Sequence, residues 1–221
     1  MKPKRIILIR HGKSQSNQCL SILKAVPDYA VELTPEGRAQ AYQAGKKIRE
    51  LIGTETVKFY ISPFWRTRQT YLEVRKNLSQ VGFQEDPRIR EQEFHTRLSA
   101  EDFVFPEEER DAYSTFYYRP LHGESAADCF DRTSDFIGSL FRDFEKEGFA
   151  DNCVIITHGL LIRVFLMRFL KLTVEEFEVL ANPQNCEFYI LELQENKKYK
   201  LITELRKHAA PKHKFIFDWS K

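Results

Sequence analysis

The side chains best suited to chemistry begin with His11, which Arg10 precedes and Gly12 follows. A lone histidine after a strand is more often structural than catalytic. However, the guanidinium of an adjacent arginine matches the oxygens of a phosphoryl group, and a neutral imidazole is a competent nucleophile. Gly12 allows the backbone to turn sharply or to approach a ligand closely. The free amides at the start of a helix favour an anion. The polar residues at the helix start expected here are Ser14, Ser16 and Asn17.

Two later segments place comparable residues after a strand. Residues 62–70 contain Arg66, and in residues 157–159 His158 stands before Gly159. Taken singly, the first is an ordinary strand-to-helix turn with solvated arginines, and the second contains a capping histidine. Three segments with histidine or arginine, each directly after a predicted strand, are not expected by coincidence. Because ligands gather at the carboxyl ends of strands in α/β folds, we expect one shared phosphate site.

The strands that must position these residues are visible as short apolar runs. Residues 6–9, 57–62 and 153–157 are continuously apolar or nearly so, which is typical of strands buried on both faces. Residues 189–193 and 199–205 predict a hairpin near the end of the chain.

Helical patterns lie between the strands. Thr34 and Pro35 predict the first turn of one helix, and Gly53 predicts its end. Ser125 caps a second predicted helix that Gly148 stops, and a third is expected to begin near residue 160.

This alternation predicts an α/β fold, a three-layer sandwich with a largely parallel central sheet and helices on both faces. Residues 97–123 fit the pattern poorly, since they combine an acidic run with an aromatic cluster. We therefore expect a single domain over residues 1–221, with a lid insertion at about residues 92–123 over the carboxyl ends of the strands.

Composition limits the other functions. The chain has 221 residues, of which 42% are hydrophobic and 30% charged, and its formal net charge is only +2. That balance does not favour a nucleic-acid partner. The most apolar helical segment, residues 160–172, carries three cations, so no membrane span is expected. No cysteine pair or carboxylate cluster has metal-ligand spacing, so we expect no metal and no cofactor. Unpaired cysteines and the lack of a secretory leader predict a cytoplasmic protein.

With these motifs, the sequence resembles the histidine phosphatase superfamily, which contains cofactor-dependent phosphoglycerate mutases and many phosphatases. The resemblance extends from residue 4 to about residue 193, and its motifs are residues 8–17, 33–37, 62–70, 89–91, 123–125 and 156–163. It implies that His11 is the nucleophile and that Glu91 is the proton donor. It also implies that the phosphate is held by Arg10, Arg66 and His158, with help from Asn17.

Several assignments stay open at this level. Glu93 lies two residues after Glu91, and on an extended segment both side chains would face the same way. Other candidate substrate-binding residues are Ser16, Gly159, His95 and Arg97. The basic segment at residues 206–214 is either a solvated tail or a cover for an anionic substrate.

The leading functional prediction is metal-independent hydrolysis of phosphomonoesters through a phosphohistidine on His11. The substrate would be a small phosphorylated molecule or a phosphopeptide. The alternative is a cofactor-dependent phosphoglycerate mutase, which residues 92–98 disfavour because they lack the segment that follows the acid in mutases. A catalytically inactive binding protein is disfavoured because the core residues are present. A bisphosphatase partner of a kinase is disfavoured because the chain has no kinase domain. The sequence leaves the oligomeric state open.

Overall fold

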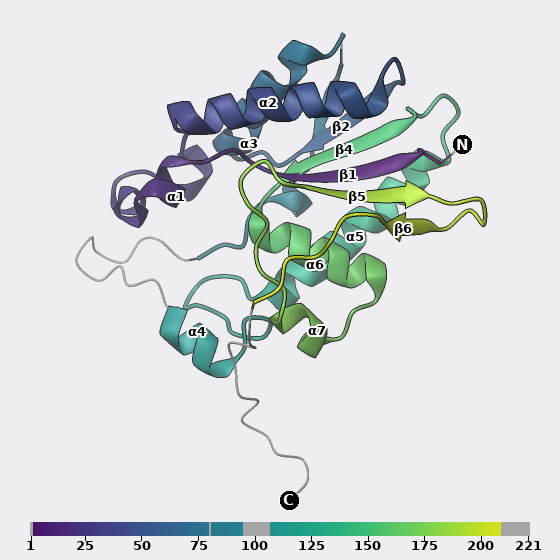
Figure 1. Ribbon diagram of the computed structural model, residues 1–221. Coiled ribbons are helices and arrows are strands. Elements are labelled where there is room, and N and C mark those ends of the chain that lie inside the picture. Colours follow the sequence, from purple (N-terminus) through teal and green to yellow (C-terminus); the bar gives the residue numbers. More distant parts are fainter. Residues whose placement is uncertain (1, 80, 95–106, 209–221) are drawn as a thin grey trace, which may run out of the picture.

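The computed structural model describes residues 2–79, 81–94 and 107–208. A six-stranded sheet runs through its centre, with the strand order β3-β2-β4-β1-β5-β6 (Figure 1). The strands are β1 (Arg5–Arg10), β2 (Val57–Ile61), β3 (Phe83–Glu85), β4 (Asn152–Thr157), β5 (Phe188–Leu193) and β6 (Tyr199–Leu201). The first four strands pair in parallel, whereas β5 is antiparallel to β1 and to β6. The sheet is therefore mostly parallel, as predicted.

Helices cover both faces of this sheet. The α-helices are α1 (Gln15–Gln18), α2 (Pro35–Ile52), α3 (Trp65–Val74), α4 (Glu107–Tyr113), α5 (Ala126–Phe144), α6 (Gly159–Leu170) and α7 (Val174–Glu178). Short 3-10 turns are η1 (Leu20–Lys24), η2 (Asp28–Ala30), η3 (Arg75–Asn77) and η4 (Pro87–Ile89). Figure 1 shows α2 and α3 on one side of the sheet, and α5 and α6 on the other.

Alternation along β1 divides the core between the two faces. Ile7 and Ile9 pack with side chains of α2 and α3, while Ile6 and Leu8 pack with side chains of α5 and α6. All four are fully buried, which explains why this strand reads as an unbroken apolar run. The three-layer prediction is confirmed.

The predicted ends of α2 are confirmed in detail. The Thr34 hydroxyl accepts a hydrogen bond from the Gly37 amide, Pro35 occupies the first turn, and Gly53 ends the helix with a φ of 58°. Ser125 caps α5 in the same way by accepting from the Asp128 amide. That helix ends at Phe144, before the glycine that we expected to stop it.

The late hairpin is also present, but its second strand is shorter than predicted. β6 ends at Leu201, because beyond it the Ile190 amide donates to the Thr203 hydroxyl instead of to a backbone carbonyl. The predicted strand 199–205 was thus too long by four residues.

Part of the predicted lid region lies among the described residues. Beyond α4, the Ser114 hydroxyl and the Phe116 amide donate to the carboxylate of Glu178, which is 2% exposed. Phe116 also packs edge-on against Phe177, at 5.3 Å between ring centroids. These contacts fix residues 114–116 to α7. The assignment of residues 92–123 as a lid stays a prediction.

Candidate active site

The parallel strands bring the three candidate segments to one edge of the sheet. β4 lies between β1 and β2, with Arg10 opposite Thr157 and Ile61 opposite Ile156. His11 and His158 follow the ends of β1 and β4, and their rings meet edge-on at 5.2 Å between centroids. Arg66 lies in the first turn of α3, just after β2. Residues far apart in the sequence therefore converge, as predicted from the strand ends.

A small cavity of about 130 Å³ lies at this edge. Its lining includes six of the predicted site residues, namely Arg10, His11, Ser16, Asn17, Arg66 and Glu91. His158 packs behind His11 and is fully buried. Gly159 opens α6, where an added Cβ would lie 3.0 Å from the side chain of Asn182. His95 and Arg97 lie outside the described residues.

The hydrogen bond made by His11 defines its tautomer. Nδ1 lies 2.7 Å from the carbonyl oxygen of Gly12, and because a carbonyl only accepts, Nδ1 must donate. The neutral ring therefore carries its lone pair on Nε2. Burial lowers the pKa of His11 well below its usual value, and the charges of Arg66 and Arg10 lower it further. His11 is thus a neutral imidazole with an available nitrogen at neutral pH.

His158 is held by the turn that follows β2. Its Nε2 lies 2.8 Å from the Ser62 hydroxyl, which also accepts from the Phe64 amide at 3.3 Å. The other ring nitrogen, Nδ1, is buried and has no hydrogen-bond partner among the described residues. Burial again lowers the pKa of His158, followed by the charge of Arg66. A buried ring nitrogen without a partner, next to His11, is suited to contact a ligand.

Both cavity arginines are anchored by backbone oxygens. Arg10 Nη1 donates to the carbonyl of Pro183 at 2.7 Å, and its buried Nε has no partner among the described residues. Arg66, only 3% exposed, donates from Nη1 to the carbonyl oxygen of Asp28 at 2.7 Å. The same guanidinium forms a bidentate ion pair with the Asp28 carboxylate, at 2.9 and 3.2 Å. With both histidines neutral, these arginines supply the positive charge of the cavity.

The orientation of Asn17 is determined by two donors. Its Oδ1 accepts from the Ser14 backbone amide at 3.2 Å and from Asn185 Nδ2 at 3.0 Å. Asn185 Nδ2 also donates to the carbonyl of His11 at 3.0 Å. Since a backbone amide can only donate and a carbonyl can only accept, both side-chain amides have one consistent orientation. The NH₂ group of Asn17 is left to donate elsewhere.

The two candidate carboxylates line different spaces. Glu91 is partly buried and lines the inner cavity, whereas Glu93 is exposed and lines an outer groove. Burial raises the pKa of Glu91, and the positive charge of Arg66 opposes that rise. Arg132 of α5 donates to the Glu91 carbonyl at 3.1 Å and to two further backbone carbonyls of this segment. The segment that carries Glu91 is therefore fixed to the body of the protein.

Gly12 makes a close backbone contact within the protein. Its φ is not in the left-handed region, and an added Cβ would lie 2.3 Å from the carbonyl oxygen of Gly37. This close approach is to the first turn of α2, and the expected approach to a ligand stays a prediction. Gly37 is equally tight, since its Cβ would lie 2.1 Å from the Lys13 carbonyl oxygen.

The inner cavity adjoins a larger groove of about 620 Å³, and the two share Leu23, Asp28 and Phe94. The groove has apolar walls that include Phe64, with Lys24 and Glu93 among its charged residues. Ligand pockets usually enclose about 300–1,000 Å³. The groove is therefore large enough for a small organic group, whereas the inner cavity is too small for one.

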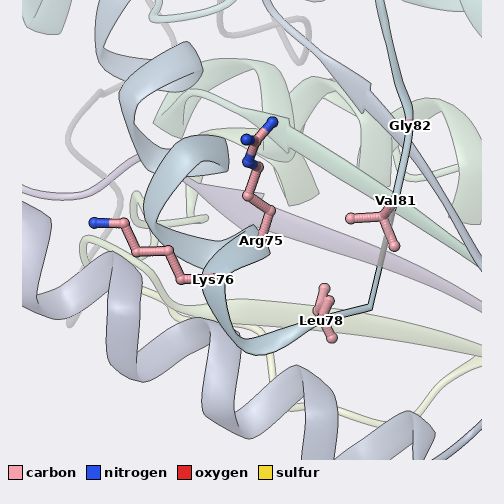
Figure 2. A pocket seen from close by; sticks show the side chains of 5 residues that line it. All are labelled: Arg75, Lys76, Leu78, Val81 and Gly82. Atoms are coloured by element: carbon pink, nitrogen blue, oxygen red, sulfur yellow. The ribbon is translucent and has the colours of Figure 1, made fainter.

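A second hollow lies at the far end of α3, away from these residues. It is lined by Arg75, Lys76, Leu78, Val81 and Gly82 (Figure 2). The Lys76 side chain extends away from Leu78 and Val81 (Figure 2). The lining of this hollow has cationic and apolar groups but no histidine or carboxylate, so it lacks the combination of groups found in the inner cavity.

Within the described ranges, no three histidine, cysteine or acidic side chains are grouped so as to hold a metal ion. No described helix is both long and apolar enough to cross a membrane.

Two residues at the site, Asp28 and Asn185, were not noted from the sequence. Ser62 was noted as the residue after a strand and within a motif of the resemblance, but not as a partner of His158. Asp28 begins the short 3-10 turn η2, and Asn185 lies in the loop before β5. Neither belongs to a motif that marks a ligand contact, and only the tertiary structure brings them to Arg66 and Asn17.

Solved structures share this fold. Mycobacterial glucosyl-3-phosphoglycerate phosphatase, solved with VO3, superimposes with a TM-score of 0.71 at 20% identity, over 92% of this chain and 100% of that chain. Bacillus stearothermophilus YhfR gives a TM-score of 0.71 at 20% identity, over 90% of this chain and 96% of that chain. At these identities the likeness shows the fold alone.

Sequence relatives are more informative. Phosphoglycerate mutase-like protein AT74H of Arabidopsis thaliana is 44% identical over 217 residues, covering 90% of this chain and 77% of that protein. Broad-range acid phosphatase DET1 of Saccharomyces cerevisiae is 26% identical, covering 93% of this chain and 90% of that protein. The sequence family described as the histidine phosphatase superfamily (branch 1) matches residues 6–204. The resemblance noted in the sequence is confirmed, and the chain belongs to the histidine phosphatase superfamily.

Proposed function

We propose that the protein hydrolyses phosphomonoesters without a metal ion, through a covalent phosphohistidine on His11. The observation that carries this proposal is the His11 hydrogen bond to the Gly12 carbonyl, which leaves a neutral imidazole with a free Nε2 beside two arginines. A nucleophile and fixed positive charge in one buried site are what phosphoryl transfer needs.

The phosphoryl group would bind in the inner cavity. Arg10 and Arg66 would neutralise its charge, and the NH₂ group of Asn17 would donate to one of its oxygens. His158 would donate from Nδ1, which is protonated if the Ser62 hydroxyl donates to Nε2. Ser16 lines the same cavity, and Gly159 would contribute through the start of α6.

In the first step, His11 Nε2 forms a bond to phosphorus while the ester oxygen leaves. Glu91 donates its proton to the departing alkoxide, and its raised pKa favours the protonated form that this role requires. In the second step, water attacks phosphorus, the bond to Nε2 breaks and Glu91 takes a proton from the water. The products are an alcohol and inorganic phosphate, and His11 is neutral again.

The sequence relatives support hydrolysis in preference to mutase chemistry. The yeast relative is named as a broad-range acid phosphatase, and it covers almost the whole chain. The Arabidopsis relative is named only as mutase-like. We therefore propose a small phosphorylated molecule or a phosphopeptide as substrate, with its leaving group in the outer groove.

The direct test uses purified protein with an aryl phosphate in EDTA. We expect turnover in EDTA and its loss in His11→Ala. Rapid acid-free quenching with a ³²P-labelled substrate should trap label on the wild-type protein in an acid-labile, base-stable form. A requirement for added divalent metal, or turnover by His11→Ala, would contradict the mechanism.

A second assay separates the mutase alternative. The protein is incubated with 3-phosphoglycerate, with and without 2,3-bisphosphoglycerate. We expect release of inorganic phosphate or no reaction. Formation of 2-phosphoglycerate stimulated by the bisphosphate would replace the phosphatase proposal.

We also propose that the protein acts in the cytoplasm. Its cysteines, Cys19, Cys129, Cys153 and Cys186, are all free thiols, which a reducing compartment preserves. Microscopy of a fluorescently tagged chain tests this location.

A further inference from the structure

We propose that Asp28 is a positioning residue of the phosphate site, an inference that rests on the proposed function. Its carboxylate and carbonyl hold the outer edge of the Arg66 guanidinium, so that a phosphate meets the remaining edge. Its negative charge also offsets part of the positive charge of the site. No motif marks Asp28, yet it lines both the inner cavity and the outer groove.

The geometry of the pair determines which donors remain. A guanidinium has five N–H groups, and Arg66 directs three of them at Asp28: Nη1 to the carbonyl oxygen and to Oδ1, and Nη2 to Oδ2. The two that remain are Nε–H and one hydrogen of Nη2, which lie on the same edge. That edge matches two oxygens of one phosphate. The Phe64 ring packs 5.0 Å from the guanidinium and limits its rotation.

The charge of Asp28 matters because the cavity has few other charges. With His11 and His158 neutral, Arg10 and Arg66 contribute two positive charges and Asp28 one negative charge. The site therefore holds a dianionic phosphate less tightly than two uncompensated arginines would. An enzyme that must release inorganic phosphate after every turnover benefits from this weaker hold.

Asp28 also acts on the proton donor. Its carboxylate favours the protonated form of Glu91, while Arg66 and Arg10 favour the ionised form. The other titratable or charged groups that interact with Glu91 from neighbouring elements are Arg163 of α6 and Cys129 and Arg132 of α5. Asp28 is the one other carboxylate among the groups named here. Removing its charge therefore leaves nothing among them to offset the effect of the arginines, which favour the ionised form of Glu91.

Two substitutions separate charge from position. Asp28→Asn keeps an oxygen acceptor for Nη1 but removes the charge. We expect inorganic phosphate to bind about fivefold more tightly, as for one charge removed at a partly screened distance. The alkaline limb of kcat/KM for glycerol 2-phosphate should move to lower pH, because Glu91 ionises more readily. Asp28→Glu keeps the charge but displaces the carboxylate, so phosphate should bind more weakly while the alkaline limb stays in place.

Glu85→Gln provides the matched control. Arg68 lies two residues after Arg66 on α3 and makes a bidentate pair with Glu85, at 2.6 and 2.7 Å, on the outside of the protein. This variant breaks a comparable arginine pair on the same helix without touching the cavity. Phosphate affinity and the pH profile should match the wild type.

Phosphate affinity is measured by calorimetry, which does not depend on turnover. The proposal is overturned if Asp28→Asn keeps wild-type affinity and pH dependence, and its positioning part is overturned if Asp28→Glu binds phosphate like the wild type. Circular dichroism confirms that each variant is folded. If the variants show these changes in phosphate affinity but the protein hydrolyses no ester, the proposed function is overturned while the role of Asp28 in phosphate binding is supported.

Discussion

Asn185 holds the side-chain amide of Asn17 in one orientation, by donating to its Oδ1 at 3.0 Å while also donating to the backbone of His11. The Ser14 amide donates to the same oxygen of Asn17 from the other side. A residue of the loop before β5 thus acts with the Ser14 amide to turn the NH₂ group of Asn17, and not its oxygen, toward other partners.

Asn185→Asp should weaken substrate binding more than Asn185→Ala. A carboxylate cannot donate to Oδ1 of Asn17, and it attracts the NH₂ group away from the phosphate. In Asn185→Asp we expect the KM for an aryl phosphate to rise about tenfold, as for the loss of one charge-assisted hydrogen bond. In an Asn17→Ala background, Asn185→Ala should add little. Gln184→Ala, at an exposed neighbour, is the control. Equal effects of Asn185→Ala with and without Asn17 would contradict this coupling.

Glu91→Gln should abolish the alkaline limb of the pH profile with a poor leaving group. In the proposed mechanism Glu91 must be protonated to hydrolyse glycerol 2-phosphate, so kcat/KM should fall as the pH rises through the raised pKa of Glu91. The variant should lose about a hundredfold in kcat, as is typical when a general acid is removed. With p-nitrophenyl phosphate, whose leaving group needs no proton, the loss should be smaller. If Glu93→Gln abolishes the limb and Glu91→Gln does not, the assignment is wrong.

The buried histidines should make the protein sensitive to acid. His11 and His158 have lowered pKa values when folded, so below about pH 6.5 the unfolded chain binds protons that the folded chain does not. Stability is therefore retained above that pH and lost as the pH falls, by up to about 1.4 kcal/mol per pH unit for each histidine. Urea unfolding between pH 7.5 and pH 5.5 measures this slope. In His158→Asn the slope should be shallower, and an unchanged slope would contradict the prediction.

Gly12→Ala should destabilise the protein strongly. The added methyl would meet the Gly37 carbonyl oxygen at 2.3 Å, and both partners are backbone that cannot rotate away. We expect a loss of about 2–4 kcal/mol in the free energy of unfolding, in the range for overpacking of a buried site. Gly82→Ala is the matched control, since no atom lies within 4 Å of its Cβ and its φ is not positive. Equal thermal midpoints of the two variants would contradict this reading.

The sequence predicted the features that have a local pattern, namely the buried strands, the helix caps and the residues at strand ends. Apolar runs located β1, β2 and β4, and the caps Thr34 and Ser125 located α2 and α5. Because parallel neighbouring strands end at the same edge, the meeting of His11, Arg66 and His158 followed from that pattern.

The remaining contacts depend on tertiary structure. Asp28 lies in a short 3-10 turn and Asn185 in a loop, and no hydrophobic period determines the path of either segment. The contact of Gly12 with Gly37 was not predicted either, because its neighbour is a helix that starts more than twenty residues later. Contacts of this kind join residues far apart in the chain, so no local pattern in a single sequence predicts them.

The Asn185 contact with the His11 carbonyl joins residues 174 positions apart. The anchor of Arg10, the carbonyl of Pro183, comes equally late. Because the ribosome makes Arg10 and His11 long before Pro183 and Asn185, the cavity cannot be completed until the loop before β5 has been made. A chain released after α6 would contain His11, Arg66 and His158 but would lack the anchors of Arg10 and Asn17.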